Sequence, residues 1–357
     1  MSGLRARTIM RAEIEESIDV VARLVARREE IGAVGAALAA RRPAVVVVAG
    51  RGTSDHAAIY ARYLLEATLG VPVALAAPSL LTQYGVNSAS PAVALVALSQ
   101  SGAGPDINAV AAASRGAGAL TIGLTNETGS PLYGAVELPI ALGAGPERAV
   151  AATKTYVAEL VAVALLAAGA AAGKRPADWT AEIAALPERT AAALAAADAW
   201  LDGAAGHPAW GALRGANRAL VVARGFQFPN ALEGALKLRE TTGIFADGYS
   251  AADLLHGPIA AASAATPTIA IATDATTGDA TARVVRRLHE IGAPLLTIGA
   301  ATAPAPARDL TIPVPLDGPL ATPVTAVALL ALVEAVAGAR GADPDAPEGL
   351  SKVTKTL

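Results

Sequence analysis

The chain has 357 residues, no cysteine and a formal net charge of −3. Its length is comfortable for two domains, and 53% hydrophobic against 17% charged residues supplies a large core and excludes extensive disorder. Without a basic excess, nucleic acid and anionic membranes are poor partners. Without cysteine, disulfides, thiolate metal sites and a cysteine nucleophile are excluded.

The sequence shows no targeting or membrane-spanning segment. The N-terminus lacks the apolar core of a signal peptide, and the longest uncharged apolar run, residues 160–173, is too short to span a bilayer. We therefore expect a cytoplasmic protein with no membrane partner.

The first half of the chain alternates apolar strands with helices. Residues 5–40 have helical spacing and mixed charge. The predicted strands that follow are residues 44–49, 71–76, 92–98, 119–124 and 137–142, and the predicted helices are 55–69, 105–115 and one after Lys154. Continuous apolar strands separated by helices predict a parallel sheet covered on both faces.

The same pattern then repeats. Residues 218–225 echo 43–50, and 297–299 with 310–314 echo 121–123 with 137–140, on either side of an alanine-rich helical connector at 178–201. The predicted fold is α/β, with two tandem doubly wound parallel-sheet domains of three αβα layers. The predicted boundaries are 1–40 for an N-terminal helical segment, 41–175 for the first domain, 176–207 for the connector, 208–340 for the second domain and 341–357 for a C-terminal tail.

One strand-to-helix turn has the composition of a phosphate site. Ser99-Gln100-Ser101-Gly102 follows a buried strand and precedes a helix opened by Pro105 and Asp106. Hydroxyls, an amide and the free N–H groups of the next helix would gather there and hold a phosphate without metal or arginine. An ordinary polar turn is the alternative. The matching turn of the second half carries Asp274, which would repel an anion, so we expect a single site shared between the halves.

A second turn ends the first strand. In Gly50-Arg51-Gly52-Thr53-Ser54, the glycines let backbone approach a ligand and two hydroxyls can donate to it. A plain glycine-rich turn is equally compatible with this stretch. The spacing fits neither a dinucleotide fingerprint nor a Walker loop, so no cofactor is expected.

Charged residues of the second half supply candidate chemistry. Glu233, Lys237 and Glu240 fall on one helical stripe, either a solvated ion-pair ladder or a base beside a lysine. His256 lies before Gly257-Pro258, on a turn, and alone it indicates a structural histidine. The histidines share no ligand-like spacing, so no metal site is expected. Lys352 lies in a tail of the kind that usually frays.

Together these segments resemble the tandem sugar isomerase (SIS) domains of the isomerase half of glucosamine-6-phosphate synthase. The resemblance runs from about residue 20 to the end of the chain. The segments that match are Gly52-Thr53-Ser54, Ser99-Gln100-Ser101-Gly102, Glu147 with Val150-Ala151-Ala152-Thr153-Lys154, the segment 231–240, His256-Gly257-Pro258 and the Lys352 tail.

The resemblance implies roles for these residues. Ser54, Ser99, Gln100 and Ser101, with Gly52 and Thr53 in the adjoining turn, would bind the sugar phosphate, and backbone near Val150 and Ala151 would line the sugar. Glu240 would carry the proton between C1 and C2, supported by Glu233 and Lys237. His256 would assist ring opening from the partner subunit of a homodimer with a shared active site, and Lys352 would close the pocket.

Departures from the synthase pattern point to one branch. Residues 103–107 replace a Glu-Thr pair, and together with residues 146–154 they look more like the stand-alone deaminases. We expect that no glutaminase domain precedes residue 1, and this sequence contains no cysteine that could release ammonia from glutamine. The expectation is a glucosamine-6-phosphate deaminase that forms fructose 6-phosphate and ammonia. The alternatives are a deaminase/isomerase for galactosamine 6-phosphate, a deglycase for amino acid–sugar phosphate adducts, and a sugar-phosphate sensor without turnover.

Overall fold

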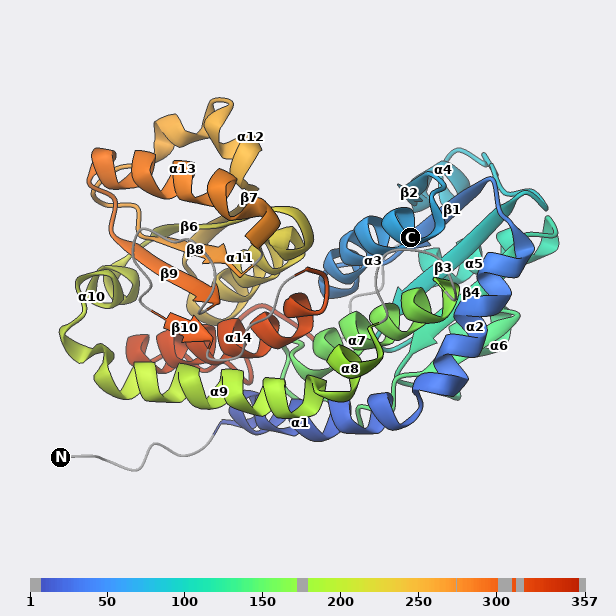
Figure 1. Cartoon of the computed structure of the whole chain (residues 1–357), viewed down its shortest axis with the longest axis horizontal. Helices are drawn as coiled ribbons and strands as arrows, with labels where there is room; N and C mark the ends of the chain where they lie inside the picture. Colours follow the sequence, from blue (N-terminus) through green and yellow to red (C-terminus); the bar gives the residue numbers. More distant parts are fainter. Residues whose placement is uncertain (1–7, 172–178, 274, 301–309, 313–317, 353–357) are drawn as a thin grey trace. The chain divides into compact units, whose positions relative to one another are not determined.

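The computed structural model describes residues 8–171, 179–273, 275–300, 310–312 and 318–352 (Figure 1). The chain divides into two compact units. Of the described residues, the first-sheet unit contains those within Asp19–Gly145 and Thr155–Pro187. The second-sheet unit contains those within Met1–Ile18, Pro146–Lys154 and Glu188–Lys352.

The first-sheet unit contains the alternating pattern expected from the sequence. Its elements are β1 (Val45–Ala49), α3 (Thr53–Leu69), β2 (Val73–Leu75), α4 (Pro78–Thr82), β3 (Val93–Ser99), α5 (Pro105–Gly116), β4 (Leu120–Thr125), α6 (Pro131–Ala135) and β5 (Leu138–Ala141). The strands pair in parallel in the order β2-β1-β3-β4-β5. Strand order reverses at β1, so the carboxyl ends of β1 and β3 adjoin where such sheets bind ligands.

Both faces of this sheet are covered, which is why its central strands are continuously apolar. On one face, Leu95 and Ala97 of β3 pack with Ile107 of α5 and Leu132 of α6. Two further helices of this part of the chain are α2 (Arg28–Arg41) and α7 (Lys154–Ala170), which pack through glycines. A Cβ at Gly169 would lie 2.0 Å from the Gly32 carbonyl oxygen, so no larger residue fits this helix pair.

The second-sheet unit repeats the same topology. Its elements are α10 (Pro208–Gly215), β6 (Arg218–Ala223), α11 (Phe228–Thr242), β7 (Phe245–Ser250), α12 (Ala251–Leu255), β8 (Thr268–Ala272), α13 (Ala275–Ile291), β9 (Leu295–Ala300), β10 (Leu310–Ile312) and α14 (Ala321–Arg340). The parallel order is β10-β9-β8-β6-β7, which is the order of the first sheet read from the other edge. The prediction of two doubly wound α/β halves is therefore confirmed.

Helices cover both faces of this sheet as well. Figure 1 shows α12 and α13 on one face and α14 on the other. Leu220 and Val222 of β6 pack against Leu254 of α12 and Leu288 of α13. In the part of the chain that the structure describes, α14 is the one helix long and apolar enough to cross a membrane, and 83% of its apolar window is buried inside the protein. That burial is what a core helix of a globular domain shows.

Two helical stretches are broken where one helix each was expected. The N-terminal stretch forms α1 (Ile9–Ala26) and α2, separated at Arg27, and the connector forms α8 (Thr180–Ala184) and α9 (Leu186–Gly203). Pro187 explains the second break, because proline has no N–H to donate to the preceding turn. Asp178, Asp274 and residues 313–314, which entered the sequence predictions, lie outside the described residues. The predicted domain boundaries stay predictions.

Candidate functional site

The serine-rich turn begins where β3 ends. The Gly102 N–H donates to Ser99 Oγ at 3.1 Å, and the Ala103 N–H donates to Ser101 Oγ at 3.3 Å. Both hydroxyls thus act as acceptors within the turn and keep their own protons for another acceptor. The Gln100 carbonyl accepts the Asn126 N–H at 3.1 Å, which ties the turn to the end of β4.

Gly102 is the residue of this turn that no other amino acid can replace. Its φ is +59°, a left-handed conformation that other residues rarely adopt. A Cβ there would lie 2.1 Å from Ser130 Oγ, so space is lacking as well. The glycine of the motif is therefore required by geometry, whatever the turn binds.

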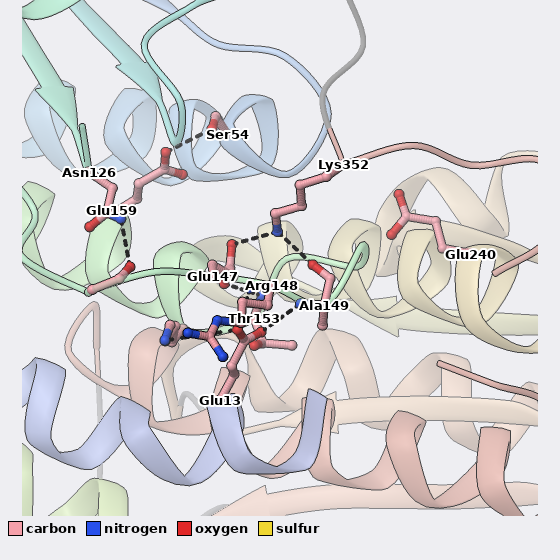
Figure 2. Close-up of polar contacts among 12 residues, drawn as sticks. Glu13, Ser54, Asn126, Glu147, Arg148, Ala149, Thr153, Glu159, Glu240 and Lys352 are labelled. Atoms are coloured by element: carbon pink, nitrogen blue, oxygen red, sulfur yellow. Dashed lines mark hydrogen bonds and ion pairs between the residues drawn. The ribbon is translucent and has the colours of Figure 1, made fainter. Parts of the chain in front are cut away.

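The turn after β1 is equally constrained. Gly52 has a φ of +55° at the start of α3, a conformation reserved for glycine. Ser54, which follows in the first turn of α3, is buried, and its hydroxyl donates to Glu159 Oε1 at 2.7 Å (Figure 2). In this arrangement the Ser54 hydroxyl donates its hydrogen bond to a buried carboxylate of α7. It offers lone pairs rather than a donor to any anion nearby.

An arginine in the same turn forms an ion pair across the two turns. Arg51 Nε donates to Asp106 Oδ2 at 2.7 Å, and Asp106 lies in the first turn of α5, directly after the serine-rich turn. Asp106 is buried, whereas half of the Arg51 side chain is exposed. Burial raises the pKa of the neighbouring Asp55, and the charges of His56 and Arg51 oppose that rise.

A second cluster of charged side chains lies on α11, in the second-sheet unit. Lys237 Nζ lies 2.6 Å from Glu240 Oε2 and 3.4 Å from Glu233 Oε1, and the side chains of Lys237 and Glu233 are at most 1% exposed. A solvated ladder is therefore excluded: the stripe faces the protein interior. Burial alone would lower the pKa of Lys237, but Glu233, Glu240 and Glu147 more than offset this, so the pKa is raised.

Unlike Glu233 and Lys237, Glu240 is accessible to solvent. Its side chain is 24% exposed, and it lies in the last turn of α11, two turns beyond Glu233. The start of α11 lies near the carboxyl edge of the second sheet, as expected, but Glu240 lies at the other end of the helix. A carboxylate held by an ammonium and open to solvent on one side has the arrangement of a general base.

Lys352 is anchored rather than frayed. Its Nζ donates to Glu147 Oε2 at 3.2 Å and to the Ala149 carbonyl at 2.7 Å (Figure 2). The Glu147 side chain is fully buried, and it also acts on Lys237 through its charge. Glu147 thus connects the tail lysine with the α11 cluster.

The loop Pro146–Lys154 that carries Glu147 is held by acids of α1. Glu13 accepts the N–H groups of Arg148 and Ala149, and Lys154 pairs with Glu13 and Glu16. Figure 2 shows Glu13 beneath this loop. Burial raises the pKa of Glu13, and the nearby Glu147 adds to that rise.

The remaining predicted site residues, Val150, Ala151 and His256, form no ion pair within the described residues. The Val150 N–H donates to the Asp345 carbonyl at 3.1 Å, and Ala151 is fully buried. His256 caps the end of α12, is exposed, and makes no side-chain hydrogen bond or ion pair within the described residues. The sequence placed it on a turn, and the structure agrees.

The structure thus gathers the predicted residues in two groups. One group lies at the adjoining carboxyl ends of β1 and β3 in the first-sheet unit: Gly52, Thr53, Ser54, Ser99, Gln100 and Ser101. The other group belongs to the second-sheet unit: Val150, Ala151, Glu233, Lys237, Glu240, His256 and Lys352. Sequence reasoning gave no role to Glu159 or to the Arg51–Asp106 pair. A lone acid within the apolar helix α7 was the available signal for Glu159. Among the described residues, no three histidine or acidic side chains gather to hold a metal ion.

The fold and these groups define a class: a duplicated, doubly wound α/β protein with a serine-rich turn in one half and a buried lysine–carboxylate cluster in the other. The SIS domain model matches residues 41–169 and 212–315. The chain belongs to the SIS domain family.

Individual relatives agree with this assignment. The chain is 34% identical over 302 residues to a glutamine–fructose-6-phosphate aminotransferase (isomerizing) of Halobacterium salinarum, covering 84% of this chain and 50% of that protein. A similar enzyme of Gloeobacter violaceus is 32% identical with the same coverage. The chain spans about half the length of the curated relatives it matches.

Solved structures show the same fold. A protein of Silicibacter pomeroyi DSS-3, provisionally described as a phosphosugar isomerase, has a TM-score of 0.83 and 33% identity, covering 95% of this chain and 100% of that one. The C-terminal domain of the Francisella tularensis glucosamine-fructose-6-phosphate aminotransferase has a TM-score of 0.84 at 22% identity over 97% of this chain and 100% of that one. A glucosamine-6-phosphate deaminase of Thermotoga maritima has a TM-score of 0.75 at 20% identity over 98% of each chain. At these last two identities the likeness concerns the fold alone.

Proposed function

We propose that this protein is a phosphosugar isomerase that acts on an amino-sugar phosphate, with glucosamine 6-phosphate as substrate and fructose 6-phosphate and ammonia as products. The observation that carries the proposal is the α11 cluster, in which a partly exposed Glu240 is held by a buried, protonated Lys237. Family membership supports a sugar-phosphate substrate, and the names of the relatives support isomerase chemistry.

The chemistry assigned to Glu240 is a proton transfer between adjacent carbons. In the open-chain sugar, the C1 aldehyde acidifies the C2 proton. Glu240 removes that proton while O1 takes up another, giving an enolamine. Glu240 then returns its proton to C1, and the nitrogen releases one. The product is the 2-imine of fructose 6-phosphate. Water adds to C2 of the imine and ammonia leaves, so one substrate and one water give one ketose phosphate and one ammonia.

Charges around Glu240 suit this role. The pKa of Lys237 is raised, so it stays an ammonium at neutral pH and cannot serve as the base. Its Nζ lies 2.6 Å from Glu240 Oε2 and so fixes the position of the carboxylate that we assign as the base. Lys352, held by Glu147, supplies a second ammonium that we assign to the substrate's oxygen at the carbonyl end.

The serine-rich turn is assigned to the other end of the substrate. Ser99 and Ser101 keep their hydroxyl protons, and the Gln100 side chain and the first turn of α5 add further donors. A phosphate held there fixes one end of a flexible open-chain sugar and thereby restricts where its reacting carbons lie.

The step from isomerase to deaminase rests on sequence likeness. Residues 103–107 and 146–154 look more like the stand-alone deaminases than the synthases. We also propose that the protein acts as a homodimer in which His256 of one copy assists ring opening in the other, and that it works in the cytoplasm.

A panel of sugar phosphates tests this function. We expect the protein to release ammonia from glucosamine 6-phosphate and to form an equal amount of fructose 6-phosphate, measured by a coupled ammonia assay and by NMR. Ammonia released faster from galactosamine 6-phosphate or from amino acid–sugar adducts would reassign the substrate. Aldose–ketose conversion without ammonia would leave an isomerase and refute the deaminase. Tight binding with no turnover would identify a sensor.

A further inference from the structure

Around the serine-rich turn, negative charge outweighs positive charge. Asp106 is buried in the first turn of α5, Asp55 lies in the first turn of α3, and Glu159 is buried behind Ser54. A phosphate dianion placed beside these acids needs a compensating cation. The hydroxyl protons of Ser99 and Ser101 are neutral donors, and Ser54 has already given its proton to Glu159.

Among the described residues, Arg51 is a cation whose ion pair lies between the two turns. Its turn follows β1 and the serine-rich turn follows β3, and these strands are paired in register, with Ala49 opposite Ala97. The two turns therefore leave the sheet side by side. Arg51 joins them through Asp106, which accepts the Nε–H at 2.7 Å.

Asp106 leaves the rest of the guanidinium available. Only Nε of Arg51 is engaged within the described residues, so both Nη groups keep their four N–H donors. Half of the side chain is exposed. Asp106 is fixed in its turn, because its other oxygen accepts the Ile107 N–H at 2.8 Å. A guanidinium held at Nε by a buried carboxylate presents the planar, two-pronged face that binds phosphate oxygens in pairs.

We propose that Arg51 binds the phosphate group of the substrate with its two Nη groups, and that Asp106 orients it for this purpose. This inference rests on the proposed function, since it assigns one residue to the phosphate end of the same substrate. It revises the expectation from the sequence that the turn would hold a phosphate without arginine. Arg51 would then separate phosphorylated from unphosphorylated sugars.

Binding by titration calorimetry tests the inference on the full chain. The ligands are glucosamine 6-phosphate, inorganic phosphate and unphosphorylated glucosamine, and the variants are Arg51→Met, Arg51→Lys, Asp106→Asn and the double variant Arg51→Met/Asp106→Asn. Losing charge-assisted hydrogen bonds should weaken both phosphate ligands by about tenfold to a hundredfold in Arg51→Met. Arg51→Lys should fall between, because lysine keeps the charge but not the paired geometry.

The Asp106 variants separate binding from simple charge neutralisation. Asp106→Asn keeps one oxygen that can accept the Arg51 Nε–H, but it then loses the acceptor for the Ile107 N–H. We therefore expect phosphate affinity to fall less than in Arg51→Met. The double variant should remain as weak as Arg51→Met. If the double variant recovers wild-type affinity, Arg51 serves only to neutralise Asp106 and the inference is wrong. It is also wrong if Arg51→Met leaves phosphate binding within about twofold of wild type, or weakens glucosamine equally.

Wild-type protein distinguishes this inference from the proposed function. If wild type binds neither sugar phosphate nor inorganic phosphate, the proposed function fails and the inference fails with it. If wild type binds and turns over the substrate while Arg51→Met is unaffected, only the inference fails. If Arg51 binds the phosphate equally in the ground and transition states, Arg51→Met should raise KM and leave kcat nearly unchanged.

Discussion

Lys237 Nζ lies 2.6 Å from Glu240 Oε2 and 3.4 Å from Glu233 Oε1, inside a helix face that the protein buries. One ammonium therefore serves several carboxylates, since Glu147 also acts on it through its charge. Because Glu233 is completely buried, the pair is more than a surface ion bridge.

Removing Lys237 should destabilise the protein strongly. Lys237→Met takes the ammonium away from the buried Glu233, and breaking a buried pair in this way costs about 3–5 kcal/mol. Lys237→Met/Glu233→Gln also removes the buried negative charge and should recover part of the loss. Thermal unfolding by calorimetry compares the two. Equal melting temperatures for the single variant and the wild type would contradict the buried network.

The Lys352–Glu147 contact predicts non-additive kinetics. Lys352→Met should lower kcat by roughly a hundredfold to a thousandfold, because an ammonium at the carbonyl end of the substrate is lost. Its melting temperature should fall as well, because Lys352→Met takes an ammonium away from the fully buried Glu147. Glu147→Gln keeps the acceptor for the Thr153 N–H but loses the ion pair.

The double variant Glu147→Gln/Lys352→Met then measures whether the two residues act as one. We expect its kcat to match that of Lys352→Met, because Glu147 acts through Lys352 in this account. Losses that multiply would show that Glu147 has a separate role in the reaction.

Gly102 provides a test of the serine-rich turn. Gly102→Ala should cost more than Gly70→Ala, although both glycines have positive φ. At Gly70 a Cβ meets nothing within 4 Å, so the backbone cost of about 1–2 kcal/mol is the whole effect. At Gly102 a Cβ meets Ser130 Oγ as well. Thermal unfolding of both variants should show this difference, and equal losses would contradict the close approach.

The raised pKa of Glu13 predicts a pH-dependent contribution to stability. An acid whose pKa is higher in the folded protein stabilises the fold below its ordinary value of 4.5 and loses this contribution as pH rises through the raised value. Glu13→Gln keeps a carbonyl acceptor for the loop and removes the titration. Relative to wild type, its melting temperature should therefore improve as pH rises from about 4 to about 7. A constant difference across this range would contradict the assignment.

Much of the fold could be predicted because the strands are continuous apolar runs bounded by turns. The runs at 92–98 and 119–124 became β3 and β4 of the first sheet. The turns could be placed as well, since Gly102 and Gly52 follow strand ends. The duplication was visible because both halves repeat the same strand and turn spacing.

Burial and long-range pairing could not be predicted in the same way. The spacing of Glu233, Lys237 and Glu240 is the same for a solvated ladder and a buried cluster, and only the packing of α11 against its neighbours decides between them. Glu147 and Lys352 are 205 residues apart in the chain, so no local pattern could join them. The break at Ala185 was missed because alanine-rich composition outweighed the single proline that follows.

Glu240 is the residue to which we assign the proton transfer between C2 and C1 of an amino-sugar phosphate. The most direct measurement follows glucosamine 6-phosphate by NMR with wild type and with Glu240→Gln, recording loss of the C2 proton and release of ammonia together. We expect both rates to fall by about a hundredfold to ten-thousandfold in Glu240→Gln, with substrate affinity preserved. Rates equal to wild type would show that another group is the base.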